Sequence, residues 1–206
     1  MRVTVIDYGA GNLASVLKAL RHLGTEPEVT AGDLTLIQKA ERIVLPGVGH
    51  FAATQKLEEL GITGAVRAAL ANGTPFLGIC VGMQWLYSGS GEAPGQAGLA
   101  QFAECCTRFS NGSEKVPHVG WNSIEPRSNS RLLRGVGSGE YVYFTHSYKA
   151  PVTIDTAAVT QYGGPFAAAV ERGHVMGVQF HPEKSGPAGL RILRNFLEWH
   201  PAEASC

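Results

Sequence analysis

The sequence predicts an α/β domain with one mixed sheet, parallel in the first half of the chain and antiparallel in the second. Two observations point to this fold class. In the first half, nearly continuous apolar runs alternate with amphipathic segments at helical spacing, as expected for parallel strands that helices cover on both faces. Beyond a Gly-rich stretch at 88–98, shorter strand-like segments follow one another as in hairpins. With no internal repeat and no long linker, residues 1–206 are expected to form one domain.

The first half supplies the elements of a doubly wound unit. Residues 2–7 form the first apolar run, and leucine and valine side chains then recur at helical spacing between Asn12, an N-cap residue type, and Gly24. The other elements expected here are strands at 42–47 and 74–79 and helices around 51–59 and 62–71.

The second half has the pattern of an antiparallel sheet. Strands are expected at 104–109, 141–148, 156–162 and 167–173, and the last of them turns back into the segment 174–183. A helix near 188–199 is expected to close the fold.

Composition argues against several classes of function. The 206 residues are 44% hydrophobic and carry 17 basic and 17 acidic side chains, which suits a soluble domain and argues against a nucleic-acid partner. No run approaches the roughly 18 apolar residues that a membrane span needs, and Met1 leads into a charged strand rather than an export signal. We therefore expect a cytoplasmic protein.

The four cysteines, Cys80, Cys105, Cys106 and Cys206, show no CxxC spacing. Cys105 and Cys106 cannot readily pair with each other, because neighbouring side chains in a strand point to opposite faces. We expect reduced thiols, no bound metal and no cofactor.

The segment "GICVG" has the form of a nucleophile elbow, a tight strand-to-helix turn centred on Cys80. Gly78 and Gly82 are the small residues that such a turn needs. The elbow would place the sulfur at a helix N-terminus, where the backbone N–H groups favour a thiolate, and the N–H of Val81 could face a developing oxyanion. The alternative is that Cys80 is simply a small buried residue.

A thiolate needs a base, and His181 is the best placed of the seven histidines. The segment "GVQFHPE" runs an apolar strand into His181, and Pro182 is expected to hold the backbone extended so that Glu183 lies on the same side. A carboxylate there would fix the imidazole tautomer, as in other nucleophile–His–acid sites. Surface positions are expected for His22, His174 and His200, whereas His50, His118 and His146 stay ambiguous.

The segment "LPGVG" at 45–49 also follows an apolar strand. Gly47 and Gly49 free the backbone so that an N–H near Val48 could point at a bound carbonyl oxygen, although a plain turn is the alternative. In open α/β sheets ligands bind outside the carboxyl ends of strands, so this segment, Cys80 and His181 could share one crevice if their strands are neighbours.

Taken together, "GICVGMQ", "PGVG" and "GVQFHPEKS" resemble the class I (triad) glutamine amidotransferases, whose fold is flavodoxin-like. Within that class, the segments 7–16, 115–122 and 141–148 are similar to the glutaminase subunits of imidazole glycerol phosphate synthases, which act in histidine biosynthesis. Met83 fits this subgroup, since most members of the class carry His there. Val81 stands where the family is expected to have Leu. The change is mild, because the expected role belongs to the backbone N–H of this residue and not to its side chain.

The resemblance implies that Cys80 attacks the side-chain amide of glutamine and that His181, oriented by Glu183, passes a proton to the leaving ammonia. Water then hydrolyses a glutamyl thioester. It also implies substrate contacts from Gln84 and from the backbone of His146, Ser147 and Tyr148; a solvated surface position is the alternative for Gln84. No metal or redox cofactor has a use in this reaction.

The resemblance further implies a heterodimer with a (β/α)₈-barrel cyclase subunit, which uses the ammonia to form imidazole glycerol phosphate and AICAR from PRFAR. Asn12 and Lys184 follow predicted strands on the carboxyl side, and Trp121 in "PHVGWN" is expected in a loop there as an interface anchor. Core burial is the alternative for Trp121. Because free ammonia would be lost to water, we expect a poor glutaminase that the partner activates by assembling the oxyanion hole.

Two other functional classes remain open from the sequence. "GAGNLA" at 9–14 fits a dinucleotide-binding turn with Asp33 at the distance of a ribose ligand, but the second strand, within 26–32, is weak. A thiol elbow also serves proteases and thiol-based stress proteins, although those functions leave "PHVGWN" and "THSY" without a task.

Overall fold

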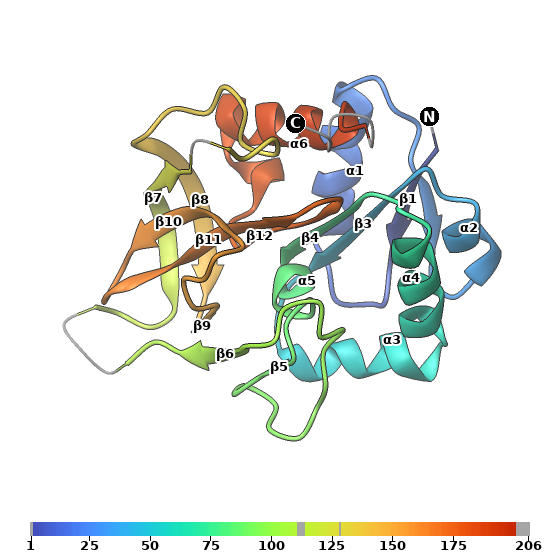
Figure 1. Ribbon diagram of the computed structural model, residues 1–206, viewed down its shortest axis with the longest axis horizontal. Coiled ribbons are helices and arrows are strands. Elements are labelled where there is room, and N and C mark those ends of the chain that lie inside the picture. Colours follow the sequence, from blue (N-terminus) through green and yellow to red (C-terminus); the bar gives the residue numbers. More distant parts are fainter. Residues whose placement is uncertain (1, 111–113, 128, 201–206) are drawn as a thin grey trace.

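A nine-stranded mixed sheet runs through the part of the chain that the computed structural model describes, residues 2–110, 114–127 and 129–200 (Figure 1). Its strands, in sheet order, are β2 (Glu28–Thr30), β1 (Val3–Ile6), β3 (Arg42–Gly47), β4 (Phe76–Cys80), β12 (Val175–Val178), β11 (Pro165–Arg172), β10 (Thr156–Gln161), β7 (His118–Pro126) and β8 (Glu140–His146). A small second sheet contains β5 (Gly89–Ser90), β6 (Cys105–Arg108) and β9 (Tyr148–Lys149).

The predicted change from parallel to antiparallel pairing is confirmed. The strands β2, β1, β3, β4 and β12 pair in parallel, whereas β11, β10, β7 and β8 continue the sheet antiparallel. Every residue of β1, β3, β4 and β12 is buried, which explains the continuous apolar runs in the sequence. The last strand, β12, returns to the middle of the sheet and lies beside β4.

The helices are α1 (Leu13–His22), α2 (Leu34–Gln38), α3 (Gln55–Glu59), α4 (Ile62–Ala71), α5 (Val81–Gln84) and α6 (Gly186–Leu197), with 3₁₀ turns η1 (Phe51–Thr54) and η2 (Pro182–Lys184). The helices α2, α3 and α4 pack together (Figure 1). Helix α1 contacts η2, the turn that leads into α6. None of the helices in the described ranges is long and apolar enough to cross a membrane.

Of two positional expectations from the sequence, the ribose-binding role of Asp33 needs correction, whereas the N-cap position of Asn12 is met. Asp33 caps the unpredicted helix α2, its carboxylate accepting from the Thr35 N–H at 2.9 Å, so it serves the backbone rather than a ribose. Asn12 occupies the N-cap position of α1 but makes no capping hydrogen bond with its side chain.

Two segments expected to be irregular contain strands. Trp121 lies in β7 rather than in a loop, because residues 118–126 pair along their length with β8. The Gly-rich stretch at 88–98 contains β5, which pairs with β6.

Close packing around α5 leaves no room for side chains at three glycines. A Cβ at Gly82 would collide with the backbone oxygen of Leu45 in β3, and one at Gly78 with the backbone of Gly82. A Cβ at Gly47 would lie 2.6 Å from the Tyr8 hydroxyl and 2.8 Å from the Gly82 nitrogen. The turn after β4 therefore depends on glycine in β3, in β4 and in α5.

We expect Gly82→Ala to lower the free energy of unfolding by at least about 2 kcal/mol, because the collision with the Leu45 backbone cannot relax cheaply. Chemical denaturation measures the effect. Gly64→Ala is the matched control, since Gly64 lies exposed in α4 with open space around it and alanine favours a helix. Equal stability of the two variants would contradict this account of the packing.

Candidate active site

Cys80 lies at the sharp turn where β4 ends and α5 begins. Its φ of 54° is in the left-handed region, which residues other than glycine adopt at a cost of about 1–3 kcal/mol. The side chain is 3% exposed. The predicted elbow geometry is therefore present, and its backbone strain coincides with the proposed nucleophile.

The sheet order places the three predicted motifs at one edge. The strands β3 and β12 flank β4 in parallel, and Gly47 is in register with Cys80. The carboxyl ends of these strands lead into Val48, Cys80 and, three residues beyond β12, His181. The three motifs could share one crevice only if their strands were neighbours, and the sheet order meets this condition.

His181 and Glu183 form a buried ion pair. The distance from His181 Nδ1 to Glu183 Oε1 is 2.8 Å, and each side chain is 1% exposed. The reason differs from the sequence expectation, because Pro182 begins the 3₁₀ turn η2 instead of extending the strand. The turn folds the carboxylate back onto the imidazole.

The environment of His181 favours its protonated form. Burial alone lowers the pKa of His181, but the Cys80 side chain and the Glu183 carboxylate together raise the pKa to about 10. Nδ1 is bound to Glu183, whereas Nε2 is buried without a hydrogen-bond partner among the described residues. The free nitrogen is the one available for proton transfer.

The predicted oxyanion donors are not all directed at the thiol. Val81 and Gly49 line the pocket at Cys80. The Val48 N–H instead donates to the Ala10 carbonyl at 3.0 Å, so this donor is engaged outside the pocket. Gly47 packs between the Tyr8 hydroxyl and α5.

A narrow pocket of about 30 Å³ lies at the thiol. Its lining residues are Gly49, Cys80, Val81, Gln84, Glu92, Thr145, His146, Ser147 and Tyr148. All four residues that the sequence assigned to substrate binding therefore surround Cys80.

Gln84 is buried, not solvated, and its amide has one defined orientation. Nε2 donates to the Tyr148 carbonyl and to Gln179 Oε1, both at 3.0 Å. Oε1 is buried without a partner among the described residues. This oxygen can accept a hydrogen bond from a ligand.

The ambiguous histidines have structural roles. His118 Nδ1 and His146 Nε2 are 3.1 Å apart, and burial lowers the pKa of His118 to about 4 and that of His146 to about 3, so both rings are neutral at pH 7. His50 is exposed and caps η1 by accepting from the Ala52 N–H at 3.1 Å.

Sequence reasoning missed four residues of the site. Thr145 and Glu92 line the pocket, Gln179 Nε2 lies 3.7 Å from the Cys80 sulfur, and the Tyr8 hydroxyl is buried beside Gly47. Burial, more than the Cys80 charge, raises the pKa of Tyr8, so this phenol stays protonated. Glu92 lies in the Gly-rich stretch, whose pattern gave no signal, and Gln179 lies inside an apparently apolar strand.

The predicted interface residues Trp121 and Lys184 both lie close to the Tyr143 ring. The Trp121 and Tyr143 rings are 6.1 Å apart, and Lys184 Nζ lies 5.6 Å from the Tyr143 ring centre. Trp121 is 55% exposed, so it is not a core aromatic. Asn12 lies at the start of α1, half-buried.

Comparison with known proteins decides the family. A family model described as glutamine amidotransferase class-I matches residues 4–199. The chain belongs to this family.

Similar proteins place this glutamine amidotransferase in one branch of the family. The imidazole glycerol phosphate synthase subunit HisH of Deinococcus radiodurans is 47% identical, with 94% of this chain and 92% of that protein covered. The HisH subunit of Methanosarcina acetivorans is 44% identical, with 96% and 98% covered. The amidotransferase described here is thus a member of the HisH subunits. A crystal structure of a glutamine amidotransferase matches with a TM-score of 0.75 at 22% identity, covering 95% of this chain and 97% of that one, which confirms the fold class.

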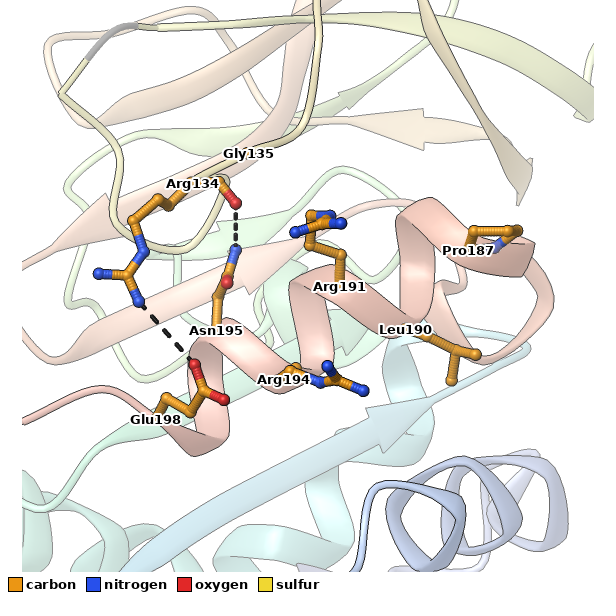
Figure 2. A pocket seen from close by; sticks show the side chains of 8 residues that line it. All are labelled: Arg134, Gly135, Pro187, Leu190, Arg191, Arg194, Asn195 and Glu198. Carbon is orange, nitrogen blue, oxygen red and sulfur yellow. Dashed lines mark hydrogen bonds and ion pairs between the residues drawn. The ribbon is translucent and has the colours of Figure 1, made fainter.

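The amidotransferase also has a larger cleft, of about 510 Å³, along α6 (Figure 2). Its side chains include Arg134, Arg191 and Arg194, and Arg134 pairs with Glu198 at 3.9 Å. None of the predicted site residues lines this cleft. In the described ranges, no three His, Cys, Asp or Glu side chains are grouped to hold a metal ion.

We expect Cys80→Ala and Glu183→Gln each to lower the pKa of His181, because each removes a group that stabilises the imidazolium. NMR titration of the His181 ring measures the change. Since the folded-state pKa of about 10 exceeds the ordinary 6.5, the stability that His181 contributes is full below pH 6.5 and is lost as pH rises towards 10. A wild-type His181 that titrates near 6.5 would contradict the ion-pair geometry.

Proposed function

We propose that this chain hydrolyses glutamine at Cys80 and passes the ammonia to the (β/α)₈-barrel cyclase subunit of an imidazole glycerol phosphate synthase. The cyclase forms imidazole glycerol phosphate and AICAR from PRFAR. The main support is the convergence of Cys80, His181 and Glu183 at the carboxyl ends of adjacent strands in a chain related to HisH subunits. Residues 1–206 act as one catalytic domain without a metal or cofactor. We place it in the cytoplasm, where unpaired thiols such as those described here persist.

The first half-reaction forms a thioester. The proton of Cys80 resides on His181, and the sulfur attacks the side-chain carbonyl carbon of glutamine. The negative oxygen of the tetrahedral intermediate accepts from the Val81 N–H. Nε2 of His181 then gives its proton to the amide nitrogen, the C–N bond breaks and ammonia leaves. The raised pKa of His181 supports this assignment of the proton.

The second half-reaction releases glutamate. His181, now neutral, takes a proton from water as the water oxygen attacks the thioester carbon. The C–S bond breaks, the electron pair returns to the sulfur, and the thiolate–imidazolium pair is restored. The product leaves with a carboxylic acid side chain, which gives its proton to the solvent to become glutamate. Glu183 stays ionised throughout and holds Nδ1 of His181, as the 2.8 Å contact supports.

Polar groups around the pocket would bind the amino-acid end of glutamine. Gln84 Oε1 offers a buried acceptor, and the Glu92 carboxylate, fixed by the Phe51 N–H at 2.8 Å, offers a negative charge for the α-ammonium group. The backbone of Ser147 and Tyr148 borders the same pocket and would contact the α-carboxylate. His146 contributes only its backbone, because its ring is already hydrogen bonded.

Val48 would complete the oxyanion hole only after a local rearrangement. Its N–H must leave the Ala10 carbonyl and turn towards Cys80, a change of one peptide unit that Gly47 and Gly49 make easy. Ala10 lies two residues before Asn12, which we assign to the partner interface. A docked cyclase could therefore act through this loop to favour the arrangement in which the Val48 N–H faces Cys80 over the one in which it is bound to Ala10.

The docking surface that we assign to the cyclase is the exposed face of β7 and β8. The register of the two strands places four large side chains on this face, namely those of Val119, Trp121, Tyr141 and Tyr143. Val119 is 56% exposed, Trp121 55% and Tyr141 61%. Lys184 adds a positive charge at its margin. Clustered exposed aromatic residues are typical interface anchors.

We expect a diazo-ketone analogue of glutamine to label Cys80 alone among the four thiols, because Cys80 is the one thiol in the described part of the chain that lies beside a base in a pocket. Mass spectrometry of the complex identifies the labelled residue. Cys80→Ala and His181→Ala should abolish glutamate release, whereas Glu183→Gln should keep part of it, since an orienting group contributes less.

Cys105→Ser is the control for the labelling experiment, because Cys105 is exposed and outside the pocket. Its label and activity should equal those of the wild type. Labelling at Cys105 or Cys106 in place of Cys80 would overturn the catalytic assignment.

We expect the isolated chain to be a poor glutaminase that the cyclase activates, and more so with the cyclase's ribonucleotide bound. The measurement is the rate of glutamate release by the isolated chain, by its complex with the cyclase, and by the complex with the ribonucleotide bound. Trp121→Ala should weaken complex formation about 30-fold, the loss typical of a buried aromatic anchor, and Lys184→Ala should weaken it less. Binding is measured by calorimetry.

Ile154→Ala is the matched control for Trp121→Ala, since Ile154 is 94% exposed and lies outside β7 and β8. It should leave binding unchanged. A lone chain that works at the full rate of the complex, or a Trp121→Ala variant that binds normally, contradicts the proposed docking face and its regulation.

A further inference from the structure

We propose that Gln179 is a catalytic residue whose side-chain amide donates a hydrogen bond to the Cys80 sulfur and stabilises its thiolate. The inference rests on the proposed function, in which Cys80 is the nucleophile. Gln179 is fully buried between the end of β12 and His181. Its Nε2 lies 3.7 Å from Cys80 Sγ, within the range of an N–H to sulfur hydrogen bond.

The backbone at Gln179 is fixed independently of the side chain. Its N–H donates to the Ala168 carbonyl in β11 at 2.8 Å. Its neighbour His181 is fixed in turn by the Tyr143 carbonyl at 2.9 Å. The amide of Gln179 therefore reaches the sulfur from a rigid strand end.

The hydrogen-bond network defines which end of the amide meets the sulfur. Gln84 Nε2 donates to the Tyr148 carbonyl, which can only accept, so Gln84 cannot be turned around. The same Nε2 donates to Gln179 Oε1 at 3.0 Å. If Gln179 were reversed, two NH₂ groups would face each other, so its Nε2 must face Cys80.

A second set of hydrogen bonds holds the Tyr148 carbonyl. His146 Nδ1 donates to it at 2.8 Å, which leaves His146 Nε2 as an acceptor for His118 Nδ1–H at 3.1 Å. Asn122 Nδ2 lies 3.4 Å from His118 Nε2 and donates to it. The network therefore extends from β7, next to the docking face at Trp121, to the thiol.

The sulfur carries negative charge at two points of the proposed cycle. It is a thiolate before attack, with its proton on His181, and it becomes one again when the C–S bond of the thioester breaks. In the thioester itself the sulfur is neutral. A fixed amide donor stabilises both charged states more than the neutral one, so it raises the fraction of enzyme that holds a thiolate ready for attack, and it favours departure of the sulfur when glutamate is released.

The test compares wild type with Gln179→Met, which keeps the length of the side chain but removes the donor. In the complex with the cyclase, we expect the pH midpoint of Cys80 alkylation by iodoacetamide to rise by about one unit, and kcat to fall about tenfold. The other titratable groups near Cys80 are its base His181, together with Glu183, Tyr8, His146 and the pocket carboxylate Glu92, and the substitution leaves all of them in place.

Asn195→Leu is the matched control. Asn195 lies in α6 and is also a buried amide, which donates hydrogen bonds to the carbonyls of Leu132 and Arg134. It should lower thermal stability without moving the alkylation midpoint. If Gln179→Met does not fold, an NMR titration of the wild-type protein tests the same proposal. The chemical shifts of the Gln179 side-chain amide protons should change with pH at the midpoint measured for Cys80 alkylation.

The outcomes separate the two levels of proposal. If Cys80 is not labelled by the glutamine analogue, the proposed function fails. If Cys80 is labelled but Gln179→Met keeps the wild-type midpoint and kcat, or the wild-type amide protons do not respond to pH, the role of Gln179 is refuted and the proposed function stands.

Discussion

The backbone of Cys80 can adopt its left-handed conformation only because β3, β4 and α5 approach each other without side chains between them. Gly47, Gly78 and Gly82 lie at this approach, and a Cβ at any of the three would meet backbone or the Tyr8 hydroxyl. The same approach makes β3 the neighbour of β4, with Gly47 in register with Cys80. The position of segment 45–49 beside the thiol is therefore a consequence of the packing that permits the turn.

Local patterns predicted much of this arrangement from the sequence. Continuous apolar runs marked the buried parallel strands, and paired glycines marked the turn at Cys80. What the sequence did not reveal depends on distant partners. The Gly and Pro residues near Trp121 predict a loop, whereas residues 118–124 all pair with β8, a strand about twenty residues further along the chain. Gln179 was hidden in an apolar strand because its partners, Gln84 and Cys80, are about a hundred residues away.

Several buried polar atoms at the site lack partners, in contrast to the satisfied network behind them. Gln84 Oε1, His181 Nε2 and Glu183 Oε2 are buried without hydrogen bonds among the described residues. Each such group costs about 1–3 kcal/mol relative to a bonded one. A ligand that supplies donors or acceptors recovers part of this cost. Gln84 Oε1 and His181 Nε2 are thus the unsatisfied atoms that glutamine could contact, while the His118 and His146 rings are hydrogen bonded to each other.

The resting position of Val48 explains why glutamine alone need not start the reaction. The Val48 N–H already has a good acceptor in Ala10, so turning it towards the thiol exchanges one hydrogen bond for another that exists only while an oxyanion is present. Ground-state glutamine offers no oxyanion and gives little differential stabilisation between the two arrangements. In the proposed function, the free energy that shifts the equilibrium comes from contacts at the loop that carries Ala10 and Asn12. A partner docked there can supply it, which ties ammonia release to the presence of its consumer.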